Sequence, residues 1–243
     1  MQPKDLMKVL GVIPSRYQSK RFPGKPLANI LGKTMLQRVY EQCKKSSLLK
    51  DIIIATDDLR ILNHVQNFGA QAMMTSKSHN SGTERCNEVV QKINSDYDLI
   101  VNIQGDEPYI QPEQINELIT LFKKEKIELG TLARIIKKDE ILKNINRPKV
   151  IIDDNHFAKK FCRIIKHSAE KKIYHEHIGL YAYTPNVLSE ICSLKETKLE
   201  KKENLEQIRW LDNKFKIKIG ITNFKSLSVD VPNDIVIIES QMR

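Results

Sequence analysis

Short runs of consecutive apolar residues alternate with helix-spaced apolar patterns in the first half of the chain, and no other feature restricts the fold as strongly. The runs occupy residues 9–13, 52–56 and 99–103. Strands that are apolar along their whole length are typical of parallel sheets covered by helices on both faces. We therefore predict an α/β fold with a Rossmann-like, mostly parallel sheet flanked by helices.

Start and stop signals mark the helices between these runs. Thr34 precedes an apolar stripe that reaches Cys43, so we expect Thr34 to act as an N-cap. The pattern of residues 59–68 stops at Gly69, where a helix commonly ends. Right-handed crossovers then bring the loops that follow the strands to one edge of the sheet, where such folds bind ligands.

The pattern changes after about residue 130. We interpret residues 1–243 as a single domain with a smaller mixed or antiparallel layer inserted at about 130–185. Strands are predicted at residues 129–136, 149–153, 157–165, 178–183 and 216–221, and helices from Pro185, over 204–211 and from Pro232.

Composition and charge exclude several classes of protein. No apolar run reaches about 18 residues, so we expect no membrane span, and residues 1–12 lack the apolar stretch of an export signal. Four widely spaced cysteines predict reduced thiols in a cytoplasmic protein. The net charge is +10. Acids interleaved with the cations argue against a nucleic-acid partner, whereas the excess of positive charge favours an anionic small-molecule substrate.

The first group of candidate ligand-binding residues lies in a proline-rich loop after the first apolar run. We call residues 14–27 the cationic loop. Pro14, Pro23 and Pro26 restrict its backbone, and Gly24 permits close approach to a ligand. Its cations are Arg16, Lys20, Arg21 and Lys25. Several converging cations on a stiff support suit a triphosphate, although the alternative is an ordinary basic surface turn.

Acidic residues follow another predicted strand in the stretch VNIQGDEP, which contains Gln104 and Asp106. Asp106 there is suited to Mg²⁺, which needs one or two carboxylates together with phosphate oxygens, and the alternative is a plain turn. Asp230 in SVDVPND is a second metal candidate, whereas Asp234 is also compatible with a helix N-terminal acid.

The stretch HNSGTERCNEVV (residues 79–90) places Ser81, Gly82, Thr83 and Arg85 at the start of a predicted helix. Main-chain N–H groups at a helix start suit base edges or phosphates. A helix cap without a ligand is the alternative.

Six motifs together resemble the 3-deoxy-manno-octulosonate (Kdo) cytidylyltransferases in order and spacing, over residues 8–238. They are IPSRYQSKRFPGKPL, SGTERCNEVV, VNIQGDEP, HIGLYAY, NLEQIRWL and VDVPNDI. The resemblance implies that CTP and Kdo give CMP-Kdo and pyrophosphate for lipopolysaccharide biosynthesis, with Mg²⁺, in a homodimer.

The resemblance also implies a role for individual residues. Arg16, Lys25 and Arg21 would meet the triphosphate, and Asp106 and Asp230 would hold the metal; Asp106, Asp230, Lys25 and Arg16 would carry catalysis. Cytosine would be contacted by Ser81, Gly82, Thr83, Arg85 and Gln104, and the sugar acid by Arg163, His177, Glu206 and Gln207. From the residues alone, His177 is also compatible with a core histidine, and Glu206 and Gln207 with an exposed helix face.

Residues 159–168 depart from the family pattern. Arg163 matches, but Cys162 replaces a serine and a proline is missing. If Cys162 faces the sugar, the KM for Kdo should be raised, and Cys162→Ser should lower it. The alternatives are a cytidylyltransferase for a related acid, 8-amino-Kdo or a sialic-type sugar, and a catalytically weak paralogue that binds CTP.

Overall fold

The computed structural model describes residues 7–19, 21–93, 95–136, 140–165, 173–225 and 227–242. The chain divides into two compact units, which are described separately. Unit 1 comprises Met1–Asn116 and Ser226–Arg243, and unit 2 comprises Glu117–Lys225.

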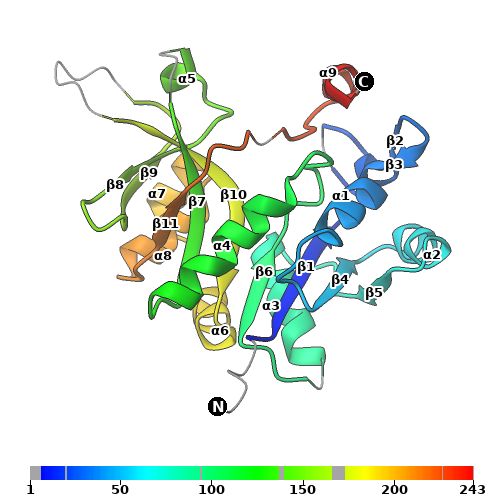
Figure 1. Cartoon of the computed structure of the whole chain (residues 1–243), viewed down its shortest axis with the longest axis horizontal. Coiled ribbons are helices and arrows are strands. Elements are labelled where there is room, and N and C mark those ends of the chain that lie inside the picture. Colours follow the sequence, from blue (N-terminus) through cyan, green and yellow to red (C-terminus); the bar gives the residue numbers. More distant parts are fainter. Residues whose placement is uncertain are drawn as a thin grey trace. The chain divides into compact units, whose positions relative to one another are not determined.

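Four parallel strands form the centre of unit 1, in the order β6-β1-β4-β5 (Figure 1). They are β1 (Val9–Ser15), β4 (Asp51–Thr56), β5 (Gln71–Met74) and β6 (Leu99–Asn102). The other elements are η1 (Lys25–Leu27), the hairpin strands β2 (Asn29–Ile30) and β3 (Lys33–Thr34), α1 (Met35–Cys43), α2 (Leu59–Asn67), α3 (Gly82–Lys92) and α9 (Pro232–Met242).

The local signals in unit 1 act as predicted. The Thr34 side chain accepts a hydrogen bond from the Gln37 N–H at 3.3 Å and caps α1. Gly69 follows α2 with a φ of 73°, which suits glycine. Strand β1 is buried along nearly its whole length, which explains its continuous apolar run.

Unit 2 is built on antiparallel pairing, except that β11 (Lys218–Ile221) pairs parallel with β7 (Leu129–Ile135). Strand β10 (His175–Tyr183) pairs antiparallel with β7 and β8 (Lys149–Ile152), and β8 pairs antiparallel with β9 (Ala158–Cys162). Its helices are α5 (Glu140–Lys143), α6 (Pro185–Ser193), α7 (Lys198–Glu203) and α8 (Gln207–Asp212), while α4 (Pro112–Lys124) spans the boundary at residues 116 and 117.

The predicted fold class, a mostly parallel sheet flanked by helices with a smaller antiparallel part, is confirmed. The limits of the insertion, about 130–185, stay a prediction. Helix α7 was not predicted. Its capping box, in which the Thr197 side chain and the Glu200 carboxylate cap each other's backbone N–H, was visible in the sequence as T-x-x-E.

No helix in the described ranges is long and apolar enough to cross a membrane. The thiols of Cys43, Cys86, Cys162 and Cys192 are all free.

Candidate active site

The cationic loop leaves β1 and is held in place by an aromatic contact. The Gly24 N–H donates to the Tyr17 carbonyl at 2.9 Å, and Gly24 has a φ of 73°. A side chain at Gly24 would meet the Tyr17 ring, since its Cβ would lie 3.0 Å from Tyr17 Oη. On the ring lies the Arg60 guanidinium, 3.3 Å from the centroid, at the start of α2. The loop is therefore stiffened by this stack as well as by its prolines.

Two cations of this loop pair with the two predicted metal ligands. Lys25 Nζ lies 2.6 Å from Asp106 Oδ2 and 2.8 Å from the Val229 carbonyl oxygen. Arg21 Nη2 lies 2.6 Å from Asp230 Oδ1. The Val229 N–H donates to the Asp106 carbonyl at 2.9 Å, so the segments that carry the two aspartates adjoin.

Arg16, the third cation, is exposed and has no side-chain partner among the described residues. Lys20 lies outside those residues. Because Arg21 is 60% exposed, its pair with Asp230 contributes little stability by itself. The more buried pair, Lys25 with Asp106, is 14% and 29% exposed and orders the centre of the site.

The ends of β1 and β6 approach each other closely beneath these charges. A Cβ at Gly105 would lie 2.8 Å from the Pro14 carbonyl oxygen, which no side chain tolerates. A Cβ at Gly82 would lie 3.3 Å from the Pro14 ring. Gln104, which is half-buried, lies two residues after the end of β6. Within unit 1, the loops after these strands therefore meet at one edge of the sheet, as predicted.

The donor set fits a hard divalent cation. The structure describes no group of three or more His, Cys, Asp or Glu side chains able to hold a metal ion within its described ranges. Two carboxylates on adjoining segments do not make a closed site, but Mg²⁺ takes one or two carboxylates and fills its remaining positions with phosphate oxygens and water. Asp106 and Asp230 therefore fit Mg²⁺ that arrives with a phosphate ligand.

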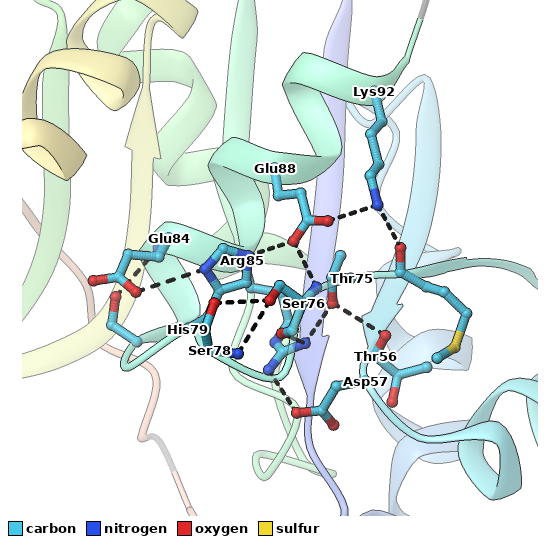
Figure 2. A network of polar contacts seen from close by, with 12 residues as sticks. Thr56, Asp57, Thr75, Ser76, Ser78, His79, Glu84, Arg85, Glu88 and Lys92 are labelled. Carbon is cyan, nitrogen blue, oxygen red and sulfur yellow. Dashed lines mark hydrogen bonds and ion pairs between the residues drawn. The ribbon is translucent and has the colours of Figure 1, made fainter.

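Residues at the start of α3 are capped and packed. Ser81 is the N-cap and accepts a hydrogen bond from the Glu84 N–H at 3.2 Å. Thr83 is buried. The side chain of Arg85 is only 4% exposed, and its guanidinium bonds Thr75, the Ser76 carbonyl and, at 3.0 Å, Asp57 (Figure 2). These contacts favour a supporting role for Arg85 over contact with a base.

In unit 2, His177 is a buried side chain on β10. Its Nε2 lies 3.1 Å from Thr131 Oγ1, and its ring packs edge-on against Phe161. Burial lowers the pKa of His177 to about 3, so the imidazole is neutral at physiological pH. A neutral imidazole suits hydrogen bonding to a sugar hydroxyl but equally suits a core position.

The guanidinium of Arg163 donates hydrogen bonds to main-chain carbonyl oxygens. Its three nitrogens donate to the carbonyl oxygens of Glu203 at 2.5 Å, Ile145 at 2.7 Å and Asn204 at 2.9 Å. Arg163 thus ties the segment after β9 to the end of α7. These bonds leave less donor capacity for a substrate carboxylate than the sequence suggested.

The other two sugar-acid candidates lie at the start of α8. The Glu206 carboxylate accepts from Arg209 Nη2 at 3.0 Å and is half-buried. Gln207 is 4% exposed, so it is not on an open helix face. Nearby, Tyr181 packs edge-on against Trp210 with 5.2 Å between ring centroids.

Comparison with known proteins assigns the chain to a family. The sequence model of the family described as Cytidylyltransferase matches residues 10–218. The chain belongs to the cytidylyltransferase family. Its members are nucleotidyltransferases, which agrees with cations and carboxylates gathered at one edge of a parallel sheet.

Similar cytidylyltransferases cover nearly the whole chain. The 3-deoxy-manno-octulosonate cytidylyltransferase of Parabacteroides distasonis is 48% identical over 242 residues, which cover 94% of this chain and 96% of that one. The 8-amino-3,8-dideoxy-manno-octulosonate cytidylyltransferase of Shewanella pealeana is 41% identical, with 97% and 99% covered. A solved CMP:2-keto-3-deoxy-manno-octonic acid synthetase complexed with CTP has a TM-score of 0.91 and 34% identity, with 97% and 98% covered.

Several contacts of this cytidylyltransferase were not predicted. The stack of Arg60 on Tyr17, and the buried Glu176 carboxylate held by Arg134 at 2.9 Å and Arg147 at 2.5 Å, join distant segments. The sequence shows the residue types but not that they contact one another. The acid Asp234 caps α9 through the N–H groups of Asp230 and Val231 at 2.7 and 2.9 Å, which confirms the helix-terminal alternative.

We expect His177 to make stability depend on pH. Its pKa is about 3 when folded and about 6.5 when unfolded, so the unfolded chain binds the extra proton. The stability that this difference contributes is complete above about pH 6.5 and is lost as the pH falls towards 3. Urea unfolding gives the unfolding free energy at pH 7 and at pH 4.5. The decrease in this free energy from pH 7 to pH 4.5 should be roughly 2.5 kcal/mol smaller in His177→Gln than in the natural protein. Equal pH dependence in both proteins would contradict a buried neutral His177.

Cys162 lies in an apolar cluster with Leu142 and Ile165 and is 7% exposed. Because the Cys162 thiol packs in this cluster, it does not face a sugar-binding site as the hypothesis required. Residues 166–168, which complete the altered stretch, lie outside the described residues. We now expect Cys162→Ser to bury a hydroxyl and to lower the unfolding free energy by about 1–3 kcal/mol without lowering the KM for the sugar acid. A lower sugar KM with unchanged stability would restore the original hypothesis.

Proposed function

We propose that this cytidylyltransferase transfers the cytidylyl group of CTP to Kdo, giving CMP-Kdo and pyrophosphate, the activation step for lipopolysaccharide biosynthesis. The observation that carries the proposal is near-complete coverage at 48% identity by a protein named for that reaction. The CTP-bound neighbour, with a TM-score of 0.91, supports the nucleotide substrate.

The cationic loop is proposed to bind the triphosphate. Arg16 is exposed, and Lys25 and Arg21 each hold a single carboxylate, so all three have donors to offer a phosphate. Charge-assisted hydrogen bonds from several cations on a stiff loop hold the α-phosphorus in one position. Ser81, Gly82, Thr83 and Gln104 are proposed to face the cytosine, and Arg85 to support them.

In the proposed reaction, the anomeric oxygen of the sugar acid attacks the α-phosphorus in line, and the hydroxyl proton passes to solvent. The bond between the α-phosphorus and the oxygen that bridges to the β-phosphorus breaks, and pyrophosphate leaves with the electron pair. Lys25 and Arg16 stabilise the negative charge that builds on the phosphate oxygens. Asp106 and Asp230 would hold Mg²⁺, which supplies further neutralisation of that charge when bound.

The sugar acid is proposed to meet residues of unit 2. His177 provides a neutral imidazole, and Glu206 and Gln207 lie at the start of α8. Arg163 remains the proposed partner for the carboxylate, although its bonds to main-chain carbonyls compete with that role.

We also propose that the protein is a cytoplasmic homodimer. Four free thiols suit a reducing compartment. Five isoleucines of unit 2 are at least 37% exposed, and burial of such residues against a second copy would lower the free energy. They are Ile135, Ile145, Ile151, Ile164 and Ile173.

Pyrophosphate release in the presence of CTP and one of several sugar acids tests the choice of substrate. We expect the highest kcat/KM with Kdo. The 41% identity to an 8-amino-3,8-dideoxy-manno-octulosonate cytidylyltransferase makes the 8-amino sugar the second candidate. A higher kcat/KM for the 8-amino sugar or for sialic acid would replace Kdo. Release with no sugar acid at all would overturn the proposal.

A further inference from the structure

The loop of residues 75–80, which joins β5 to α3, is held mainly by side chains of α3. The Ser76 N–H donates to Glu88 Oε2 at 2.7 Å, and the Asn80 N–H donates to Glu84 Oε2 at 2.8 Å. Carboxylates on one helix thus bind main-chain N–H groups near the beginning and at the end of the loop. The conformation of this loop therefore depends on α3 side chains.

Glu88 is the centre of this arrangement (Figure 2). The same carboxylate that binds the Ser76 N–H also bonds His79 Nε2 and, at 2.6 Å, Lys92 Nζ. Lys92 in turn donates to the Met74 carbonyl oxygen at 3.0 Å. One half-buried acid therefore joins the end of β5, both halves of the loop and the middle of α3.

The Glu88 carboxylate is ionised at physiological pH. Burial opposes its ionisation, but hydrogen bonds from Lys92, the Ser76 N–H and His79 outweigh burial and lower its pKa to about 2. Its side chain is 16% exposed, so these charge-assisted bonds are partly shielded from water.

Arg85 holds the same loop from one helical turn earlier. Its guanidinium bonds Thr75 and the Ser76 carbonyl, and its ion pair with Asp57 links it to the turn after β4. Thr75 also donates through Oγ1 to the Thr56 carbonyl at 3.0 Å. Arg85 therefore binds the carbonyl oxygen of Ser76, and Glu88 binds its N–H group.

The loop leads directly into the part of α3 that is proposed to face the cytosine. Ser81 caps that helix, and Gly82 lies against the Pro14 ring at the start of the cationic loop. A shift in the loop of residues 75–80 is transmitted to Ser81 and Gly82, because the chain is continuous. A displacement of about 1 Å at a recognition site is enough to cost about a hundredfold in activity.

We propose that Glu88 is a positioning residue for base recognition: with Arg85 it fixes the loop of residues 75–80, and thereby the Ser81–Thr83 N–H groups and hydroxyls, at the cytosine. This inference rests on the proposed use of CTP. We expect substitution of Glu88 to act mainly on nucleotide selection, because its bonds go to the loop of residues 75–80 and to Lys92 and not to the strands of the sheet.

CTP and UTP differ only in the base, so their relative affinity reports on base recognition alone. We compare Glu88→Ala and Glu88→Gln with two control variants, Gln91→Ala on the exposed side of α3 and Glu190→Ala, an exposed acid on α6. Calorimetric titration with each nucleotide, in the absence of sugar acid, gives the preference for CTP over UTP.

Glu88→Ala is expected to reduce the preference for CTP about tenfold or more, and the controls to leave it unchanged within about twofold. Glu88→Gln keeps an acceptor for the Ser76 N–H and should retain an intermediate preference, so it carries the test if the alanine variant does not fold. The KM for the sugar acid should change less than about twofold.

An unchanged preference in Glu88→Gln and Glu88→Ala, with a lower unfolding temperature, would show that Glu88 serves stability alone and overturn the inference. Equal affinity of the natural protein for CTP and UTP would also overturn it. If the natural protein prefers CTP, Glu88→Ala loses this preference, and yet no pyrophosphate is released with any sugar acid, the positioning role stands and the proposed reaction fails.

Discussion

Asp106→Asn is expected to lower kcat by a factor on the order of 1000 or more. The substitution removes a negative charge from the proposed metal site and keeps the shape of the side chain, because it only replaces one carboxylate oxygen by an amide nitrogen. The local fold should persist, because Lys25 also donates to the Val229 carbonyl at 2.8 Å, and the Asp106 carbonyl accepts from the Val229 N–H at 2.9 Å. The rate of pyrophosphate release at saturating substrates, with circular dichroism as a check on folding, measures the effect.

Two further variants make this experiment specific. Asp230→Asn should also reduce kcat strongly, because its carboxylate lies on the adjoining segment. Asp154→Asn, in an exposed turn of unit 2, should leave kcat within about twofold. Asp106→Asn with a kcat within tenfold of the natural protein and a native circular dichroism spectrum would exclude Asp106 as a metal ligand.

Lys25→Met is expected to raise the Kd for CTP about 10- to 150-fold. The methionine keeps the apolar stem but loses a charge-assisted contact to phosphate, which is worth about 1.5–3 kcal/mol. Affinity for the sugar acid should change far less, because Lys25 is proposed to contact the triphosphate and not the sugar acid. Titration calorimetry with CTP in the presence of Mg²⁺ measures the change.

Lys33→Met is the matched control, because Lys33 is an exposed cation of the neighbouring hairpin and pairs with Glu41 at 2.7 Å. It should leave the Kd for CTP unchanged within about twofold. The loss of affinity in Lys25→Met should shrink at high salt, where charged contacts are screened. Equal Kd values for Lys25→Met and the natural protein would mean that the cationic loop binds another anion.

The predictions that held depend on local sequence. The run at residues 9–13 became β1, Thr34 caps α1, and Gly69 ends α2, because backbone propensity and capping act over a few residues. The gathering of Gly105 and Pro14 at one edge of the sheet follows from the parallel pairing of β1 and β6, which places the carboxyl ends of both strands at the same edge.

The features that could not be predicted depend on contacts between distant segments. Nothing near Lys25 in the sequence indicates that its partner is Asp106, and nothing near Glu88 indicates that it binds the Ser76 N–H. Arg85 was predicted to contact the base because it follows a recognisable motif, whereas its burial comes from packing against Thr75 and Asp57. A motif identifies which residues matter, but their partners follow from tertiary structure.

The most direct test of the proposed reaction is phosphorus NMR of the protein with CTP, Kdo and Mg²⁺, compared with mixtures that omit one substrate. We predict that the complete mixture loses CTP and gains a phosphodiester signal of CMP-Kdo and free pyrophosphate in equal amounts. Mixtures without Kdo or without CTP should form neither product. Stable CTP in the complete mixture, or its breakdown without a CMP-Kdo signal, would contradict the account.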